Sequence, residues 1–364
     1  MSKKTIRFEG LVYEPSGYGT VAREMFHGLS PFFHSSLIGY AGRFETGESI
    51  LSAEMAQNFR LIKNAKFDKY NFRLSVMAAY EYLKDMPDCD YQILATVHEA
   101  DYVKQDWVDI CNRFNEIWVP SNFVRGVFDK CGVKNTVLFP HGVSQVMFEN
   151  FEDKILPQDL YTFLSIFEPQ FRKAPDVLLR AYLKEFTSDD KVSLVLKTNP
   201  KTRDFLVSFV QKISKEIDND FLPKITILAK FYSDSGMSQL YDSASAYVFP
   251  SRAEGFSLTC LEAMAHGKPV IATDYSAMKD YLTDKTGYPL KVNRLVEIGE
   301  NANGIPWYEP NMKFAEPDED HLRGLMRMLY ETNIRYNIAA VEKAEEYRWS
   351  RIVEKMRERL YGLN

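Results

Sequence analysis

The chain has 364 residues, and it lacks any apolar run long enough to cross a membrane. No window approaches the roughly 18 consecutive apolar residues that a membrane-spanning helix needs. The first ten residues also lack the apolar stretch of a secretory signal. We therefore expect a cytoplasmic protein, one that can still contact a membrane peripherally.

Cysteines are few, and none stands in the spacing of a metal or redox site. The four are Cys89, Cys111, Cys131 and Cys260, and they form no C-x-x-C pair. Cys260 has no neighbouring histidine that would activate it as a nucleophile. The run 88–90 has the Asp-x-Asp letters of a metal clamp, but it precedes a strand, and we interpret it as a loop. We expect reduced structural thiols and no metal or other cofactor.

An excess of positive charge is also missing. Lys and Arg total 45 against 50 Asp and Glu, which gives a formal net charge of −5. Such a chain has no protein-wide positive field with which to hold a nucleic acid. We expect no nucleic-acid partner.

What is present is the composition of an ordinary soluble globular protein, 45% apolar and 26% charged. The length suggests two domains. Short β-branched or aromatic runs alternate with amphipathic stretches from end to end, which favours an α/β fold with parallel sheets. The predicted strands are 5–11, 91–97, 116–120, 136–139, 162–167, 193–198, 225–229, 246–250 and 269–273.

The organisation of these units indicates two Rossmann-like domains with a ligand cleft between them. A polar, irregular stretch near residue 150 marks the boundary. We expect residues 1–150 to form the amino-terminal domain and residues 151–345 the second. The remaining residues, 346–364, carry a closing helix (350–360) that is expected to pack back on the first domain.

A glycine-rich loop follows the first predicted strand. Gly17, Gly19 and Ala22 fit G-x-G-x-x-A ahead of a predicted helix over 20–29, so the backbone can approach a phosphate closely. The loop is longer than a dinucleotide-binding turn, and no acidic residue follows where a ribose partner is needed. A plain strand-to-helix turn explains the glycines equally well.

The most informative stretch is 246–267. Its predicted strand leads into Glu254-Gly255-Phe256-Ser257-Leu258, with Ser257 as the expected N-cap of a helix that ends before Gly267. That helix directs its positive end at the sheet edge where α/β domains bind phosphates. Glu262 lies two turns into the helix. The two carboxylates can therefore reach different parts of one elongated ligand, although Glu254 as a first-turn acid and Glu262 as a surface charge are the simpler alternative.

A basic pair follows the first strand of the second half. Arg172 and Lys173 occupy another strand-to-helix loop that is expected at the same sheet edge. A guanidinium fork beside an ammonium suits a diphosphate, whereas two solvated surface charges are the alternative.

Taken together, these residues resemble the retaining glycosyltransferases of family 4 (glycosyl transferases group 1), which have the GT-B fold of two Rossmann-like domains. The likeness covers nearly the whole chain. It includes the glycine loop, His141-Gly142-Val143, the basic pair, the Glu254-to-Glu262 block and the closing Trp349-Ser350. The usual Lys-Gly is Lys173-Ala174 here, and the usual Asp after Gly-Val is Ser144.

The resemblance implies a role for each matching position. Glu254 and the amides of Gly255, Phe256, Ser257 and Leu258 would hold the donor sugar and phosphates, and Glu262 the ribose. Arg172 and Lys173 would neutralise the leaving diphosphate, and Gly17 and Gly19 would close over it. His98, after a first-domain strand, would lie beside the donor sugar, although a core histidine is the alternative there.

The implied activity is that of a hexosyltransferase-like enzyme. It would move a sugar, with retention and without a metal, from a nucleotide-diphosphate sugar to a hydroxyl of a glycan or glycolipid acceptor, in glycan or polysaccharide synthesis. Two alternatives remain open. One is a non-catalytic nucleotide-sugar binder, and the other is an NAD-dependent oxidoreductase that uses the G-x-G-x-x-A loop.

Overall fold

The computed structural model describes residues 3–40, 47–78, 89–217 and 220–363. Its chain divides into two compact units. Unit 1 comprises residues 1–144, 305–309 and 347–364, and unit 2 comprises residues 145–304 and 310–346. The first boundary therefore falls between Ser144 and Gln145 rather than at residue 150. The reason is that the 3-10 turn η4 (Gln145–Phe148) packs on unit 2, where Val146 accepts a hydrogen bond of 2.6 Å from Ser238.

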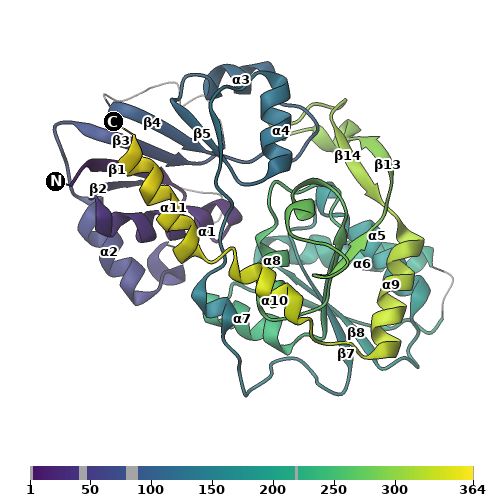
Figure 1. Ribbon diagram of the computed structural model, residues 1–364. Helices are drawn as coiled ribbons and strands as arrows, with labels where there is room; N and C mark the ends of the chain where they lie inside the picture. The colour runs from purple at the N-terminus through teal and green to yellow at the C-terminus, as the bar shows by residue number, and fades with distance from the viewer. Residues whose placement is uncertain (1–2, 41–46, 79–88, 218–219, 364) are drawn as a thin grey trace. The chain divides into compact units, whose positions relative to one another are not determined.

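Unit 1 contains, in its described part, a parallel sheet of six strands in the order β2-β1-β3-β4-β5-β6 (Figure 1). The strands are β1 (Thr5–Gly10), β2 (His34–Gly39), β3 (Tyr70–Val76), β4 (Cys89–Ala95), β5 (Glu116–Val119) and β6 (Thr136–Leu138). The helices are α1 (Gly17–Leu29), α2 (Ala53–Lys63), α3 (Gln105–Cys111), α4 (Asn122–Cys131) and α11 (Trp349–Gly362).

Unit 2 contains a second parallel sheet, again of six strands among the described residues, in the order β12-β11-β10-β7-β8-β9. Its strands are β7 (Tyr161–Ile166), β8 (Val192–Thr198), β9 (Lys224–Ala229), β10 (Ala246–Phe249), β11 (Val270–Thr273) and β12 (Tyr288–Leu290). An antiparallel pair, β13 (Val292–Glu297) and β14 (Lys313–Pro317), lies outside this sheet. The helices are α5 (Pro175–Glu185), α6 (Arg203–Glu216), α7 (Asp234–Ser243), α8 (Leu258–Ala265), α9 (Glu319–Thr332) and α10 (Ile338–Glu345).

The central strands explain why the α/β prediction succeeds. Every residue of β7, β10 and β11 is buried, as expected for parallel strands that are covered on both faces. The apolar runs that produce this burial are visible in the sequence. All nine predicted strands occur, with ends that differ by one or two residues.

Strands β2, β3 and β12 to β14 are not among the nine predicted strands, and in β2 and β3 polar residues interrupt the apolar ones. Arg73 on β3 is buried, and its guanidinium donates to Glu9 on β1 at 2.9 Å and 2.6 Å. Ser75 also donates to Glu9, at 3.2 Å. A charge inside a core is tolerated only when it is paired, and this partner lies 64 residues away in the sequence. The pattern of β3 alone gives no sign of that pairing.

Two local predictions are wrong. The helix predicted to start at Thr20 begins at Gly17, because Ser16 caps it by accepting the amide of Gly19 at 3.2 Å. Cys89 and Asp90, which were interpreted as part of a loop, already belong to β4, while Asp88 lies outside the described residues.

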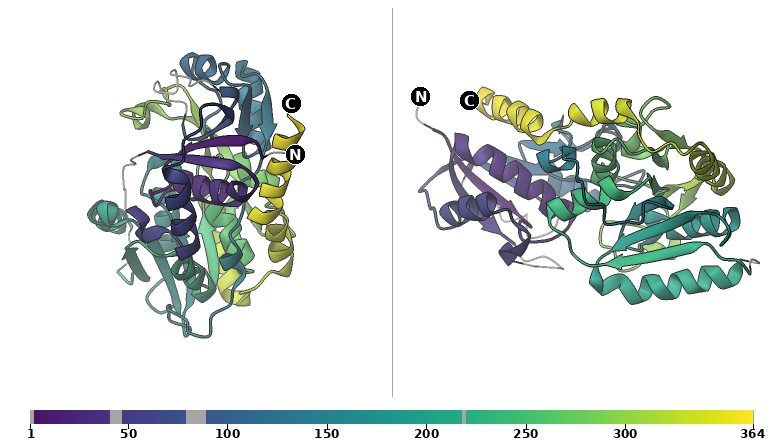
Figure 2. Two further views of the ribbon diagram at one scale, coloured as in Figure 1. Left: turned by 90° about the vertical axis from the view of Figure 1, so that its left-hand side faces the viewer. Right: turned by 90° about the horizontal axis from the view of Figure 1, so that it is seen from below.

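The closing helix α11 belongs to unit 1, where it lies beside α1 (Figure 2). Its first residue docks on the His141-Gly142-Val143 segment. The Val143 amide donates a hydrogen bond of 2.7 Å to the carbonyl oxygen of Tyr347, and the Trp349 amide donates one of 3.2 Å to the carbonyl oxygen of Val143. The Trp349 side chain is buried. A Cβ atom on Gly142 would lie 2.5 Å from the Trp349 ring, so only glycine lets the two segments approach this closely.

This contact predicts that Gly142→Ala destabilises unit 1. Because the neighbouring atoms include backbone, the added methyl group forces a shift, and we expect a loss of about 2 kcal/mol in the free energy of unfolding. The matched control is Gly126→Ala on α4, where no described atom would lie within 4 Å of the new Cβ. Urea denaturation followed by tryptophan fluorescence measures both, and equal stabilities would contradict the close docking of Trp349.

Candidate functional site

Two adjacent strands of unit 2 bring the predicted residues to one sheet edge. β7 and β10 are hydrogen-bonded neighbours in a parallel sheet, so their carboxyl ends lie side by side. The loop after β7 leads through the 3-10 turn η5 (Phe171–Lys173) into α5, and the loop after β10 leads into α8. Both loops therefore reach the edge at which open α/β sheets bind ligands.

Glu254 is the centre of this cluster. Its carboxylate is 8% exposed and lies 2.6 Å from the Lys173 ammonium and 2.8 Å from the Arg172 guanidinium. The Ser251 hydroxyl donates to the same carboxylate at 2.7 Å. Burial alone would raise the pKa of the Glu254 carboxyl, but the two cations outweigh it, so the pKa lies below its ordinary value. Glu254 is therefore a buried, fully ionised carboxylate.

The sequence predicted these three residues at one edge, but not that they would bind one another. In the structure the two cations are already neutralised in part by Glu254, which leaves a cluster with one net positive charge. Lys173 also places its ammonium 5.1 Å from the centre of the Phe249 ring. The net positive charge of this cluster at the sheet edge can attract an external anion.

Arg252 holds the two loops together, and sequence reasoning missed it. Its side chain is 3% exposed and contacts both Asp176 oxygens at 2.9 Å. It also contacts Glu316 on β14 at 2.8 Å and 3.0 Å. Its guanidinium lies 4.1 Å from the centre of the Phe171 ring. Arg252 directly precedes the Glu254 motif in the sequence, but only the fold shows that its partners lie on α5 and β14.

The start of α8 differs from the prediction. Ser257 occupies the N-cap position, yet its backbone is left-handed, with φ at +69°, and its side chain makes no capping hydrogen bond within the described chain. The expected Ser257 cap is therefore wrong. The carbonyls of Phe256 and Ser257 are held by the Tyr281 hydroxyl at 2.9 Å and 3.2 Å. The first amides of α8 thus sit on a fixed turn without a side-chain cap, an arrangement that favours an anion.

Glu262 is half-buried on α8. Its Oε2 accepts a hydrogen bond of 2.7 Å from the Tyr241 hydroxyl on α7. Burial raises the pKa of Tyr241 well above its ordinary value, so this hydroxyl remains a donor. Lys197, near the end of β8, lies in the field of Glu262 and Glu168, although burial lowers the pKa of its ammonium. Glu262 is therefore not the simple surface charge of the alternative interpretation.

In unit 1 the two predicted glycines differ in their surroundings. Both lie in the first turn of α1 rather than in a loop before it. A Cβ on Gly19 would lie 2.0 Å from the backbone oxygen of Glu14, whereas a Cβ on Gly17 would meet no described atom within 4 Å. Gly19 is required by local packing. Gly17 leaves open space above the helix start, as a ligand would need.

His98 lies three residues after the end of β4 and is 1% exposed. Its Nε2 lies 2.7 Å from the carbonyl oxygen of Tyr102, and the Trp107 and Tyr308 rings lie 5.5 Å and 6.0 Å away. The glycine turn also contacts the segment before His98. Tyr18, which lies between Gly17 and Gly19, accepts a hydrogen bond of 3.3 Å at its hydroxyl from the amide of Val97. His98 is thus placed after a strand end, as the resemblance implies, and packed among rings, as a core histidine would be.

Three further features of the described residues concern metal binding, membrane-spanning helices and the reactivity of thiols. No group of three His, Cys, Asp or Glu side chains among them is arranged to hold a metal ion, and no helix among them is long and apolar enough to cross a membrane. Burial raises the pKa of the Cys111 and Cys260 thiols to about 12, so both are inert as nucleophiles.

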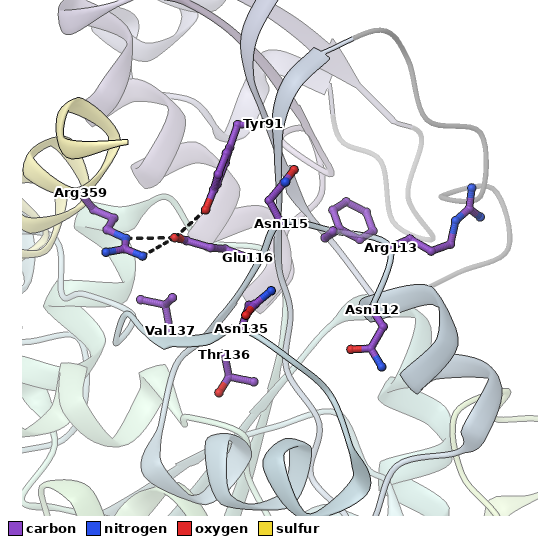
Figure 3. A pocket seen from close by; sticks show the side chains of 10 residues that line it. Tyr91, Asn112, Arg113, Asn115, Glu116, Asn135, Thr136, Val137 and Arg359 are labelled. Carbon is purple, nitrogen blue, oxygen red and sulfur yellow. Dashed lines mark hydrogen bonds and ion pairs between the residues drawn. The ribbon is translucent and has the colours of Figure 1, made fainter. Parts of the chain in front are cut away.

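A polar hollow of about 660 Å³ lies elsewhere in unit 1, at the amino ends of β4, β5 and β6 (Figure 3). None of the sequence-predicted site residues lines it. The lining residues are Tyr91, Asn112, Arg113, Phe114, Asn115, Glu116, Asn135, Thr136, Val137 and Arg359. Glu116 binds Tyr91 and Arg359 there, each at 3.0 Å, so Arg359 ties α11 to the sheet. This hollow lies at the amino ends of the strands, whereas His98 follows the carboxyl end of β4.

The sequence of this chain is similar to those of known glycosyltransferases. Residues 159–302 match the family model of the glycosyl transferases group 1. An uncharacterized glycosyltransferase of Methanocaldococcus jannaschii is 24% identical over 281 residues, which are 76% of this chain and 61% of that protein. A D-inositol 3-phosphate glycosyltransferase of Streptomyces avermitilis is 32% identical over 152 residues, 36% of this chain and 29% of the relative. The chain thus spans about three fifths or less of the length of these relatives.

Solved structures resemble this chain in fold over nearly its full length. A sucrose-phosphate synthase of Thermosynechococcus elongatus superposes with a TM-score of 0.70 at 15% identity, and 99% of this chain and 98% of that one are covered. Anabaena HepE, solved in complex with UDP and glucose, superposes with a TM-score of 0.68 at 12% identity over 99% of this chain and all of the other. At these identities the likeness concerns the fold, and it confirms the predicted GT-B fold.

The two glycines give a prediction that separates packing from ligand approach. Gly19→Ala drives a methyl group into backbone and is expected to lower the free energy of unfolding by about 3 kcal/mol. Gly17→Ala is expected to leave the stability within about 0.5 kcal/mol of the wild type, because its new Cβ meets no described atom. Urea denaturation of both variants decides the matter, and a Gly17→Ala protein as unstable as Gly19→Ala would refute the distinction.

Proposed function

We propose that this chain, whose residues 159–302 match the glycosyl transferases group 1 and whose fold is GT-B, transfers a sugar from a nucleotide-diphosphate sugar to an acceptor hydroxyl. The match and the fold confirm the resemblance to group 1 glycosyltransferases, and membership of family 4 stays a prediction. The observation that carries the proposal is the cluster of Glu254, Arg172 and Lys173 beside the start of α8.

The chemistry requires a stabilised leaving group. When the bond between the anomeric carbon and the diphosphate breaks, negative charge grows on the phosphate oxygens. Arg172, Lys173 and the first amides of α8 are donors held at one sheet edge, and they can receive this charge. We propose that these groups supply the positive charge and that no metal or other cofactor takes part.

Glu254 acts as a placeholder in this proposal. In the free protein it binds the two cations, and a bound diphosphate competes with it for them. The displaced carboxylate becomes a charge-assisted acceptor for hydroxyl groups of the donor sugar. The Tyr241 hydroxyl donates to Oε2 of Glu262 and so orients this carboxylate. We assign Glu262 to the ribose hydroxyls.

The transfer is proposed to retain the anomeric configuration. The acceptor oxygen attacks the anomeric carbon on the face from which the diphosphate leaves, and its proton passes to a phosphate oxygen of the leaving group. One carbon–oxygen bond breaks and one forms, so no enzyme carboxylate is consumed. His98 and Gly17 belong to unit 1, and the resemblance assigns them to the sugar and the diphosphate respectively.

The substrate classes rest on the resemblance and on what is printed for similar proteins. HepE was solved with UDP and glucose, and another structural relative is a pneumococcal O-GlcNAc transferase in complex with UDP and GlcNAc. These names support a nucleotide-sugar donor here, and the proposal of a glycan or glycolipid acceptor rests on the resemblance. A lipid-linked acceptor would bring the cytoplasmic protein to a membrane surface peripherally.

Nucleotide binding tests the proposal. We expect one of UDP, GDP, ADP or TDP at saturating concentration to raise the melting temperature by about 5 °C, since a ligand that binds only the folded state stabilises it by mass action. Glu262→Gln should remove most of this shift, because a neutral amide is a weaker acceptor for ribose hydroxyls. The matched control is Glu319→Gln on α9, whose carboxylate binds Arg180 and Lys184 instead.

Three outcomes of this panel, combined with an assay of nucleotide-sugar turnover, differ in meaning. A shift that Glu319→Gln preserves and Glu262→Gln abolishes supports the donor site. A shift with NAD alone would instead favour an oxidoreductase that uses the glycine turn. Nucleotide binding without turnover of any nucleotide sugar would leave a non-catalytic binder.

A further inference from the structure

Residues 305–309, Ile-Pro-Trp-Tyr-Glu, are contributed to unit 1 by the second half of the chain. They follow the 3-10 turn η8 (Gly299–Ala302) and precede β14, and both of these elements belong to unit 2. The pentapeptide itself is grouped with unit 1. We call residues 305–309 the strap.

The strap binds one loop of unit 1 through three hydrogen bonds. The Tyr308 hydroxyl donates to Glu99 at 2.7 Å, and the Tyr102 hydroxyl donates to Glu309 at 2.7 Å. Lys104 donates its ammonium to the carbonyl oxygen of Pro306 at 3.1 Å. The first two bonds join a hydroxyl to a carboxylate, the stronger kind of hydrogen bond in proteins.

Apolar contacts reinforce these bonds. The Tyr308 side chain is buried, with its ring centre 6.0 Å from that of His98. Trp307 packs against a hydrophobic cluster of unit 1 that includes Val103 and Trp107. The strap therefore contacts this loop through an aromatic face as well as through polar groups.

The loop concerned, residues 98–104, depends on such contacts for its shape. It lies between β4 and α3 and has neither helical nor strand structure. His98 is the first residue of this loop, and its Nε2 lies 2.7 Å from the backbone oxygen of Tyr102. Any shift of Tyr102 relative to Glu309 would therefore move the atom that orients the imidazole.

We propose that the strap is a positioning element for the transfer reaction, with Tyr308 and Glu309 as positioning residues that hold Glu99 and Tyr102 and so fix His98. This inference rests on the proposed function, because the importance of His98 follows from it. It adds that the reactive geometry of unit 1 is completed by residues from the other half of the chain.

Tyr308→Phe tests the idea with the loss of one oxygen atom. The matched control is Tyr91→Phe, which also removes a hydroxyl-to-carboxylate hydrogen bond in unit 1, the 3.0 Å bond to Glu116 shown in Figure 3. Tyr91 lies on the same strand that leads to His98, but near its other end. The two variants therefore lose similar bonds at different places.

Two measurements are made on each protein. Hydrogen exchange by mass spectrometry should show amides 98–104 exchanging about tenfold faster in Tyr308→Phe than in the wild type or Tyr91→Phe, since a hydrogen bond to a charged group contributes about that factor. In nucleoside diphosphate release from the donor, kcat should fall about tenfold for Tyr308→Phe while the donor KM stays within about twofold. A merely structural role would lower the melting temperatures of both variants alike and leave this split absent.

Glu309 provides a second, independent variant pair. Glu309→Gln keeps a carbonyl oxygen that can accept from Tyr102, and it should retain most of the wild-type kcat. Glu309→Ala removes the acceptor and should behave like Tyr308→Phe. Unchanged exchange at 98–104 in both Tyr308→Phe and Glu309→Ala, or a kcat loss equally large in Tyr91→Phe, would overturn the proposal. If the wild type turns over no nucleotide sugar, the proposed function fails, and the exchange data still decide whether the strap fixes the loop.

Discussion

One interaction, the burial of the Glu254 carboxylate among two cations, fixes the two loops that form the candidate site of unit 2. A buried anion is costly unless cations and hydrogen-bond donors surround it, and here Arg172, Lys173 and Ser251 do so at 2.6–2.8 Å. The cations come from the loop after β7 and the carboxylate from the loop after β10. The pairing therefore fixes these two loops against each other. Arg252 links them further through its ion pairs with Asp176 and Glu316. The same cluster leaves a net positive charge at the sheet edge.

Much of this edge was predictable because its signals are local or follow from strand order. The Glu254 and Glu262 spacing, the basic pair and the glycine at 267 can all be found in the sequence, and parallel strands bring their carboxyl ends together. What could not be predicted are pairings between distant residues. The binding of Glu254 by Arg172 and Lys173, the partners of Arg252 and the burial of Arg73 against Glu9 each join residues more than 60 positions apart. The periodicity of apolar residues along the sequence does not indicate which distant residues pair with each other.

The wrong local predictions have a related cause. Ser257 has the residue type of an N-cap, but its left-handed backbone, held by Tyr281, keeps it from making the capping bond. The start of α1 moved because Ser16 caps it three residues earlier than the glycine pattern suggested. In both cases the residue type was recognised correctly, and a contact or a dihedral angle decided its role. The strap at 305–309 was missed altogether, because its partners at 99–104 precede it by about two hundred residues.

The central claim is that the Glu254 cluster serves sugar transfer, and turnover tests it most directly. The wild type, Lys173→Ala and Glu254→Ala would each be incubated with a panel of nucleotide-diphosphate sugars, and nucleoside diphosphate release would be followed by chromatography. The account predicts release from one donor by the wild type and its loss in both variants, with circular dichroism spectra unchanged. Full release by either folded variant, or none by the wild type from any donor, would contradict it.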